Sequence, residues 1–149
     1  MTDAATDVTA AAATAANRAM MQRDLASAAL GMVVERDEPG LAVVSMRVRD
    51  DMTNGFRITH GGLVFTLADT AFAIACNEDD TVTVAAGADI TFLKSTVAGQ
   101  TLTATAVRRT RSGRTGLYDV SVVDEHGDAV AEFRGRSIST NRTISRPVE

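Results

Sequence analysis

Hydrophobic residues run with few interruptions from Leu63 to Cys76, in the middle of the chain. Nearly every residue of this run is Leu, Val, Phe, Ala or Ile, and only Thr66, Asp69 and Thr70 are polar. A helix that is apolar on all sides is a buried helix rather than a surface one. The pattern therefore predicts a buried central helix. It also leaves Asp69 to be explained, because an unpaired buried carboxylate is costly to ionise.

Strand patterns lie on both sides of the predicted helix. Before it, Met32–Glu35 and Leu41–Arg49 flank the turn composition Asp37–Gly40, which predicts a hairpin. After it come four runs with the length or the alternation of strands, namely Thr81–Leu93, Thr101–Arg109, Thr115–Val123 and Ala129–Ser139. Tight turns at Ser112-Gly113 and His126-Gly127 predict that the last three strands form an antiparallel meander.

The remaining segments complete one domain. Residues 1–17 are almost all Ala, Thr and Asp and predict a frayed tail, and 141–149 predict a polar C-terminal tail. Arg18–Leu30 has apolar residues at helical spacing, which predicts a short amphipathic covering helix. Asp50–Thr59 has no apolar period and is expected to be a loop. The globular domain is therefore expected to span residues 18–140.

The order of elements is a hairpin, a buried helix and four strands. An antiparallel sheet with its helices on one face is an α+β arrangement. One long helix can be apolar all round only if the sheet wraps it or a second subunit covers its far side. The pattern therefore predicts the hotdog fold, an antiparallel sheet wrapped around one long central helix.

Composition narrows the class of protein only slightly. The 149 residues fit one domain, with 45% hydrophobic and 23% charged residues. A formal net charge of -4 argues against a general nucleic-acid binder. The single cysteine, Cys76, cannot form an intramolecular disulfide, and no secretory signal pattern is present, so a cytoplasmic location is expected. The central helix, with an Asp at its middle, is not expected to span a membrane.

Candidate chemistry begins at His60-Gly61-Gly62, where the predicted helix starts. Helix N-termini favour negative charge, so the Gly61 N–H is a candidate donor to a developing oxyanion. Asp69 lies eight residues further, about 12 Å along the helix axis. Because both groups would have to come within about 3 Å of one reacting carbon, the spacing predicts that a second chain completes the site. Asn54 lies in the preceding loop, where its amide could orient a water or the acid.

Each of these residues also has a plainer interpretation. His60-Gly61-Gly62 is also the composition of a simple turn into a helix, and Asn54-Gly55 is a common turn signal. The Asp69 carboxylate could be capped by a neighbouring threonine or by backbone. From the residues alone, these alternatives stay open.

Other kinds of site have less support. No His or Cys pair has the spacing of a metal site, no Gly-x-Ser-x-Gly elbow is present, and no Walker A or dinucleotide motif occurs. A basic group along one strand end and hairpin is either a phosphate-binding cluster or a solvated rim. Its members are Lys94, Arg108, Arg109, Arg111 and Arg114.

Together, Asn54-Gly55, His60-Gly61-Gly62 and Leu67–Ala73 resemble the PaaI-like hotdog acyl-CoA thioesterases of the phenylacetic acid degradation type. Further similar segments extend the resemblance over about residues 25–140, and they are Asp89–Leu93, Ala98-Gly99, Gly116–Val120 and Phe133–Gly135. One departure is that Val84–Gly87 lacks the hydroxyl that some relatives carry on the strand after the helix.

The resemblance implies hydrolysis of an acyl-CoA thioester, such as phenylacetyl-CoA, a ring-hydroxylated derivative or a medium-chain acyl-CoA. Gly61 would donate to the thioester oxygen with support from His60, Asp69 of the facing subunit would act as base or nucleophile, and Asn54 would place the water or the acid. The residues expected to bind substrate are Gly62, Thr70, Ala85, Arg111 and Arg114.

The same resemblance implies no metal or organic cofactor, and a homotetramer made of two dimers. Two other functions compete with hydrolysis. One is a non-catalytic module or sensor that binds acyl-CoA. The other, with less support, is a hotdog hydratase or dehydratase, which typically needs a His and an acid on the acyl chain, whereas His60 precedes the helix.

Overall fold

Six strands form one antiparallel sheet in the computed structural model, which describes residues 15–145. The sheet order is β1-β2-β4-β5-β6-β3. The strands are β1 (Val33–Glu38), β2 (Leu41–Arg47), β3 (Thr81–Phe92), β4 (Thr101–Ser112), β5 (Thr115–Val123) and β6 (Ala129–Thr143). Every neighbouring pair is antiparallel, and β4, β5 and β6 form the predicted meander. Strands β1 and β3 are therefore the two edges of the sheet.

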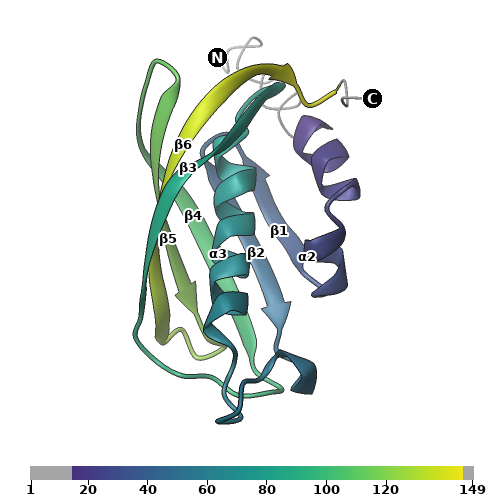
Figure 1. Cartoon of the computed structure of the whole chain (residues 1–149), viewed down its shortest axis with the longest axis vertical. Coiled ribbons are helices and arrows are strands. Elements are labelled where there is room, and N and C mark those ends of the chain that lie inside the picture. The colour runs from purple at the N-terminus through teal and green to yellow at the C-terminus, as the bar shows by residue number, and fades with distance from the viewer. Residues whose placement is uncertain (1–14, 146–149) are drawn as a thin grey trace, which may run out of the picture.

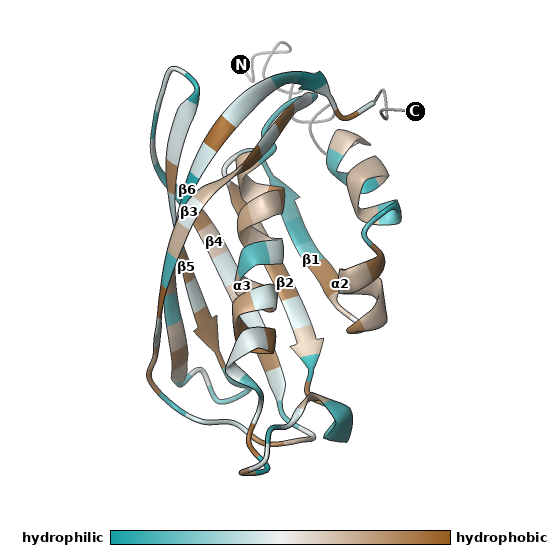
Figure 2. Ribbon diagram, in the orientation of Figure 1, coloured by the Kyte–Doolittle hydropathy of each residue, from teal (hydrophilic) through white to brown (hydrophobic). Residues whose placement is uncertain are grey.

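The sheet curves around the central helix α3 (Gly61–Cys76), as Figure 1 shows. Strand β2 turns Ala42, Val44 and Met46 toward this helix, and these residues and Val48 just after the strand are buried, as their alternation predicts. Figure 2 shows the hydropathy of the residues along α3 and the strands behind it. The α+β hotdog arrangement expected from the sequence is therefore confirmed.

Aromatic rings fill the space between α3 and the far strands. The ring of Phe72 lies 5.5 Å from that of Tyr118 and 5.8 Å from that of Phe133, measured between centroids. A Cβ atom at Gly135 on β6 would come within 2.7 Å of the Phe72 ring. Glycine at this position therefore allows the helix to approach the sheet closely.

Side chains at both ends of α3 fix its position. At the start, His60 is the N-cap residue. At the end, the Asn77 amide nitrogen donates to the carbonyl oxygens of Ala73 at 2.7 Å and Thr83 at 3.1 Å, and its oxygen accepts from the Thr83 N–H at 2.9 Å. Asn77 thus ties the end of the helix to strand β3 and satisfies backbone groups that a helix end leaves free.

The N-terminal boundary differs from the prediction. Residues 15–22 are helical and a second short helix, α2 (Leu25–Ala29), follows, so one predicted helix is two. The break occurs because the Asp24 carboxylate caps α2, accepting from the Ser27 N–H at 2.9 Å and the Ser27 hydroxyl at 2.7 Å. The helical segment includes Asn17, which was predicted to lie in a tail. It is 1% exposed and donates to the carbonyl oxygen of Ile74 at 3.1 Å.

The predicted C-terminal tail is also shorter than expected within the described residues. Strand β6 continues to Thr143, which pairs with Thr81, and Ile144 is 3% exposed. The sequence did not predict these last residues of the strand, because their side chains are polar and the strand is formed by backbone pairing with β3.

No helix within residues 15–145 combines the length and hydropathy needed to cross a membrane.

Candidate active site

The start of α3 presents one free backbone donor. The Nδ1 atom of His60 accepts a hydrogen bond from the Gly62 N–H at 3.0 Å, and the His60 N–H donates to the Met52 carbonyl at 2.9 Å. Gly61 is the first residue of the helix, and its N–H makes no hydrogen bond within residues 15–145. His60 therefore fixes the turn and leaves the Gly61 N–H available to an anion at the positive end of the helix dipole.

Asn54 and Gly61 line the same cavity, of about 280 Å³, which we call the loop cavity. The Asn54 side-chain oxygen accepts from the backbone N–H groups of Phe56 at 2.9 Å and Ile58 at 3.4 Å. Asn54 is thus the turn residue that its plainer interpretation predicts. Because the oxygen is held by the turn, the side-chain NH₂ remains as a donor without a partner in the described part of the chain.

Asp69 lines a second cavity, of about 480 Å³, which we call the helix cavity. Its carboxylate is half-buried and makes no hydrogen bond or ion pair with any of residues 15–145. The capping alternative fails because Thr66 donates to the Gly62 carbonyl at 2.8 Å and Thr70 is hydrogen-bonded to the Ser27 hydroxyl at 3.0 Å. Burial and, to a smaller extent, the negative charge of Asp24 raise the pKa of Asp69.

The two cavities do not share a lining residue. Asn54 and Gly61 belong to the loop cavity, whereas Asp69 belongs to the helix cavity, about two helical turns away. One chain therefore does not bring the predicted acid and the predicted oxyanion donor together.

Among the residues predicted to bind substrate, Ala85 lies at the helix cavity. Thr70 instead lies beneath α2 and is 6% exposed, so its hydroxyl faces Ser27 rather than a cavity. The N–H of Gly62 is taken by the His60 ring. Periodicity placed Thr70 on the helix but could not show that α2 covers it.

The basic group divides into separate ion pairs and, at Arg114, hydrogen bonds. The buried carboxylate of Glu78 accepts from Arg108 at 2.7 Å and from Arg111 at 3.1 Å. Removing these partners would leave a buried unpaired carboxylate and strongly destabilise the folded protein, so both arginines have a structural role. Arg114 donates to the Ser139 carbonyl at 3.1 Å and to the Asn141 side chain at 3.2 Å. The prediction that Arg111 and Arg114 bind substrate gains no support from this geometry.

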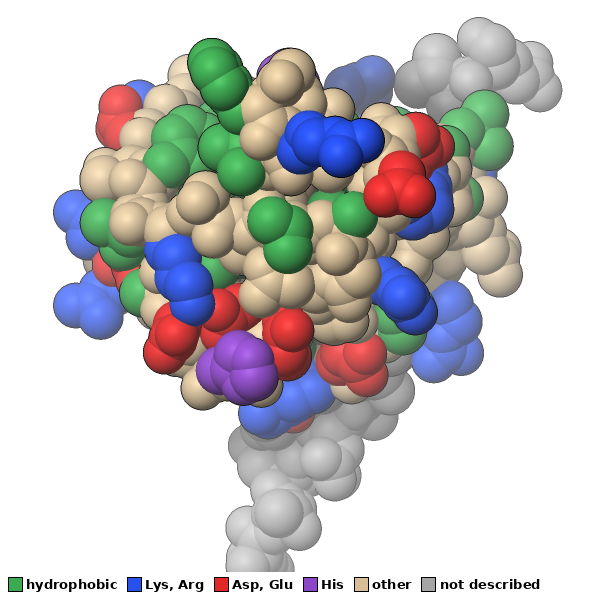
Figure 3. Space-filling model, turned by 90° about the horizontal axis from the view of Figure 1, so that it is seen from below, with side chains coloured by type: hydrophobic (Ala, Val, Ile, Leu, Met, Phe, Trp, Pro, Cys, Tyr) green, Lys and Arg blue, Asp and Glu red, His purple; other side chains and the backbone are tan. Residues whose placement is uncertain are grey.

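The other two members of the group lie elsewhere. Arg109 is paired with Asp119 at 3.4 Å, and Lys94 is paired with Asp124 and Asp128 at 2.7 Å each. Figure 3 shows the lower end of the molecule, where basic, acidic and hydrophobic side chains are interspersed, whereas the β4–β5 hairpin lies at the opposite end in Figure 1. Closeness in sequence suggested a cluster, but the partners come from distant strands and turns.

A model of the thioesterase superfamily matches residues 56–131. The acyl-coenzyme A thioesterase PaaI of Escherichia coli (strain K12) is 44% identical over 127 residues, which make up 85% of this chain and 91% of that protein. The chain belongs to the thioesterase superfamily.

Solved structures of thioesterase-superfamily relatives agree with this assignment. The E. coli PaaI protein from the phenylacetic acid degradation operon is 42% identical, with a TM-score of 0.87, covering 90% of this chain and 97% of that chain. Smu.793 from Streptococcus mutans UA159, solved bound to acetyl CoA, is 25% identical with a TM-score of 0.71, covering 75% and 90% of the two chains. The predicted resemblance to PaaI-like thioesterases is confirmed.

The helix cavity of this thioesterase homologue contains residues that the sequence did not single out. Met20 and Arg23 come from the N-terminal segment predicted only to cover the core, and Arg142 comes from the predicted tail. Cys76 also lines the cavity, and burial raises the pKa of its thiol to about 12, which makes it a poor nucleophile at neutral pH. Among residues 15–145, no group of three His, Cys, Asp or Glu side chains is arranged to hold a metal ion.

Proposed function

We propose that this protein hydrolyses acyl-CoA thioesters to free acids and coenzyme A, at a site shared between two subunits. The observation that carries the proposal is the Asp69 carboxylate, which is half-buried at a cavity and has no partner among the described residues. An unpaired carboxylate with a raised pKa is a candidate functional group. The name of the E. coli relative supports acyl-CoA as the substrate class, and the acyl group is an aryl-acetyl or a medium-chain one.

The available groups support an ordered mechanism. Asp69 of one subunit takes a proton from water, and the oxygen of that water attacks the thioester carbonyl carbon. The Gly61 N–H of the other subunit binds the oxyanion, while His60 keeps that turn in place. The C–S bond then breaks, coenzyme A leaves as a thiolate, and the proton held by Asp69 returns to the products. If Asp69 instead attacks directly, water hydrolyses the resulting anhydride.

Asn54 can serve this mechanism only as a hydrogen-bond donor. Its oxygen is occupied by the turn, so its NH₂ group would donate to a water oxygen or to an oxygen of the thioester or acid. This assignment supports a role in placing the reactants beside Gly61, in the same loop cavity. A role in accepting the proton of the water is excluded by the same geometry.

The shared site requires at least a dimer, and we propose the dimer of dimers that the resemblance implies. Separation of Asp69 from Gly61 in one chain supports the dimer, and the resemblance alone supports the pairing of two dimers. Hydrophobic side chains are also exposed near the loop cavity and along the β3 edge, including Phe56 at 86%, Phe92 at 54% and Leu93 at 55%. Exposed apolar groups of this size favour burial by another subunit.

A non-catalytic acyl-CoA-binding module is the second candidate. It is favoured by Val84–Gly87, which carries no hydroxyl to hold a water. Release of free thiol from phenylacetyl-CoA and a panel of aryl and medium-chain acyl-CoAs separates the two functions when measured beside calorimetric binding. Turnover supports the hydrolase, whereas binding without turnover across the panel supports the module.

No added cofactor should be needed for hydrolysis. The cytoplasmic location of the protein stays a prediction.

Mixing two inactive variants is expected to restore part of the activity. Asp69→Ala keeps Gly61, and Gly61→Pro keeps Asp69, so each mixed dimer contains one site with both groups intact. Random pairing should recover about a quarter of the wild-type thiol-release rate. Each variant dissociated and reassociated alone is the control. If oligomers verified as mixed by mass spectrometry stay inactive, the site is not shared in this way.

The pH dependence of kcat/KM is expected to report Asp69. Either as base or as nucleophile the carboxylate must be ionised, so activity should fall on the acid side at a pH above the ordinary aspartate pKa. Asp24→Asn removes the neighbouring charge while keeping a side chain that can cap α2, so this acid limb should move to lower pH. If the acid limb of the kcat/KM profile stays at the same pH in Asp24→Asn, a group other than Asp69 controls it.

A further inference from the structure

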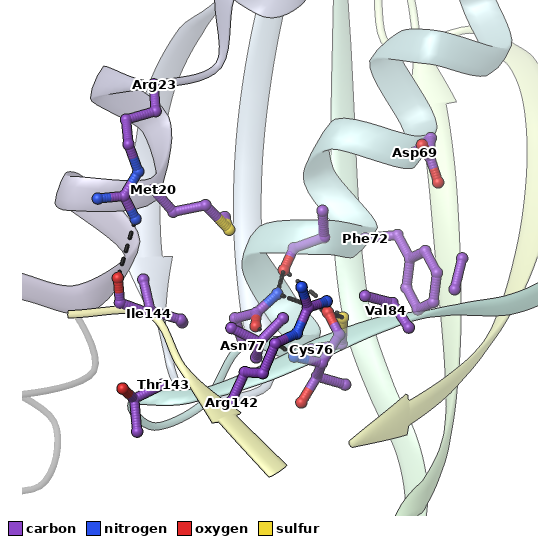
Figure 4. A pocket seen from close by; sticks show the side chains of 14 residues that line it. Met20, Arg23, Asp69, Phe72, Cys76, Asn77, Val84, Arg142, Thr143 and Ile144 are labelled. Atoms are coloured by element: carbon purple, nitrogen blue, oxygen red, sulfur yellow. Dashed lines mark hydrogen bonds between the residues drawn. The ribbon is translucent and has the colours of Figure 1, made fainter. Parts of the chain in front are cut away.

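The helix cavity follows one face of the second half of α3. Its lining from this helix is Asp69, Phe72, Ala73, Cys76 and Asn77, which have the spacing of a single helical face. From Asp69 to Asn77 the face extends about 12 Å along the axis. Strand β3 contributes Val82, Thr83, Val84 and Ala85 to the lining, and Figure 4 shows Asp69, Phe72 and Val84 on one side of this cavity.

Polar side chains in the middle of the cavity, between Asp69 and Arg142, are already satisfied by the fold. Asn77 uses both ends of its amide on Ala73 and Thr83. The Thr83 hydroxyl is bonded to Ser139 at 3.1 Å, and the Cys76 thiol donates to the Ala73 carbonyl. A ligand with internal amides would lose hydrogen bonds to water without gaining these side chains as partners. The middle of the cavity therefore suits an apolar chain rather than the pantetheine arm of coenzyme A.

Two arginines line the cavity, Arg142 at the end away from Asp69 and Arg23 across its width. Thr143 pairs with Thr81 at the start of β3, which places Arg142 near the end that Asn77 forms. The Arg142 guanidinium makes no hydrogen bond or ion pair within the described residues. Arg23 donates to the Ile144 carbonyl at 2.9 Å, which leaves further N–H groups of its guanidinium free. Figure 4 shows Arg23 across the cavity from Asp69.

We infer that this cavity holds the acyl group and that Arg142 binds a carboxylate at the far end of that acyl chain. The inference rests on the proposed function and adds a substrate class, the coenzyme A monothioesters of medium-length dicarboxylic acids. The thioester lies at Asp69, the methylene chain contacts Phe72 and Val84, and the distal carboxylate receives charge-assisted hydrogen bonds from the Arg142 guanidinium. The separation of about 12 Å along α3 sets the length of the chain.

The test compares octanoyl-CoA with suberyl-CoA, which have the same chain length and differ in the terminal carboxylate. Arg142→Ala is expected to lower kcat/KM for suberyl-CoA about fivefold and to change that for octanoyl-CoA less than about twofold, since the ion pair lies at an exposed rim. Added salt should reduce this selective loss. Arg47→Ala, which removes an exposed arginine of β2 outside both cavities, should change neither substrate.

Three outcomes would overturn the inference. An equal loss for both substrates would show that Arg142 meets the phosphates of coenzyme A, which both molecules carry. An unchanged kcat/KM of Arg142→Ala for both substrates would exclude a distal carboxylate site. The same conclusion would follow if the wild-type protein hydrolysed octanoyl-CoA but not suberyl-CoA. If no thioester is hydrolysed, the proposed function fails instead. In that case, calorimetry with the non-hydrolysable thioether analogues of octanoyl-CoA and suberyl-CoA tests the inference. Arg142→Ala should lower the affinity for the suberyl analogue and leave that for the octanoyl analogue nearly unchanged.

Discussion

Asp69→Asn is expected to lower kcat for acyl-CoA hydrolysis about a thousandfold, with a much smaller change in substrate binding. The amide has nearly the shape of the carboxylate but cannot take a proton from water or attack the thioester. Single-turnover thiol release gives the chemical step, and calorimetry with a thioether analogue gives the binding. Glu35→Gln, which neutralises an exposed carboxylate on edge strand β1, is the matched control and should keep wild-type kinetics.

The same substitution is expected to make the protein more stable at neutral pH. Burial raises the pKa of Asp69, so ionisation of this carboxylate in the folded protein opposes folding. The stabilising contribution of its protonated form is complete below the unfolded-state pKa and is lost as the pH rises through the higher folded-state pKa. Chemical denaturation of Asp69→Asn should therefore show a higher free energy of unfolding than wild type near neutrality, and the difference should vanish in acid.

Activity and stability together make this a demanding test. Wild-type kcat on every active substrate would refute the role of Asp69 in catalysis. Loss of activity together with loss of stability at neutral pH would instead mean that the carboxylate holds the fold through a contact with the second subunit. Only loss of activity with a gain in stability matches an unpaired carboxylate kept for function.

Gly61→Pro is expected to lower kcat about a hundredfold or more while leaving the helix folded. The substitution removes one backbone N–H, the proposed oxyanion donor, at a cost typical of such donors. Proline suits this position because Gly61 is the first residue of α3, where the ring's φ is helical and no intrahelical bond is lost. His60, the preceding residue, has φ -60° and ψ 127°, a conformation that a following proline requires.

Gly61→Ala is the control that isolates the N–H group. Both variants add a Cβ atom, which would lie 3.1 Å from the Phe92 ring, but alanine keeps the donor. The contact is with the outer end of the Phe92 ring, which needs to move by only a few tenths of an ångström, so alanine should retain most of the activity. Circular dichroism and the oligomeric state confirm that each variant is folded. Equal losses in the two variants would assign the effect to crowding by the side chain and not to the oxyanion.

Local signals in the sequence predicted much of this protein. The apolar run from Leu63 predicted the central helix, and strand Thr115–Val123 has its predicted bounds. These features are short-range, because strand alternation and helix caps depend on neighbouring residues. The candidate chemistry at Gly61 and Asp69 was also visible, since a glycine at a helix start and an acid in an apolar helix are local departures from an ordinary pattern.

Contacts between distant segments were decided only by the tertiary structure. Arg111 forms an ion pair with Glu78, 33 residues away in the sequence. Thr70 is hydrogen-bonded to Ser27, 43 residues away in the sequence. Arg142 reaches the helix cavity because β6 pairs with β3 beyond its predicted end. The sequence alone determined the order of elements, the buried helix and its exceptional acid, because those follow from local periodicity. Which charges are paired and which stay free depends on long-range packing, and only the folded chain shows it.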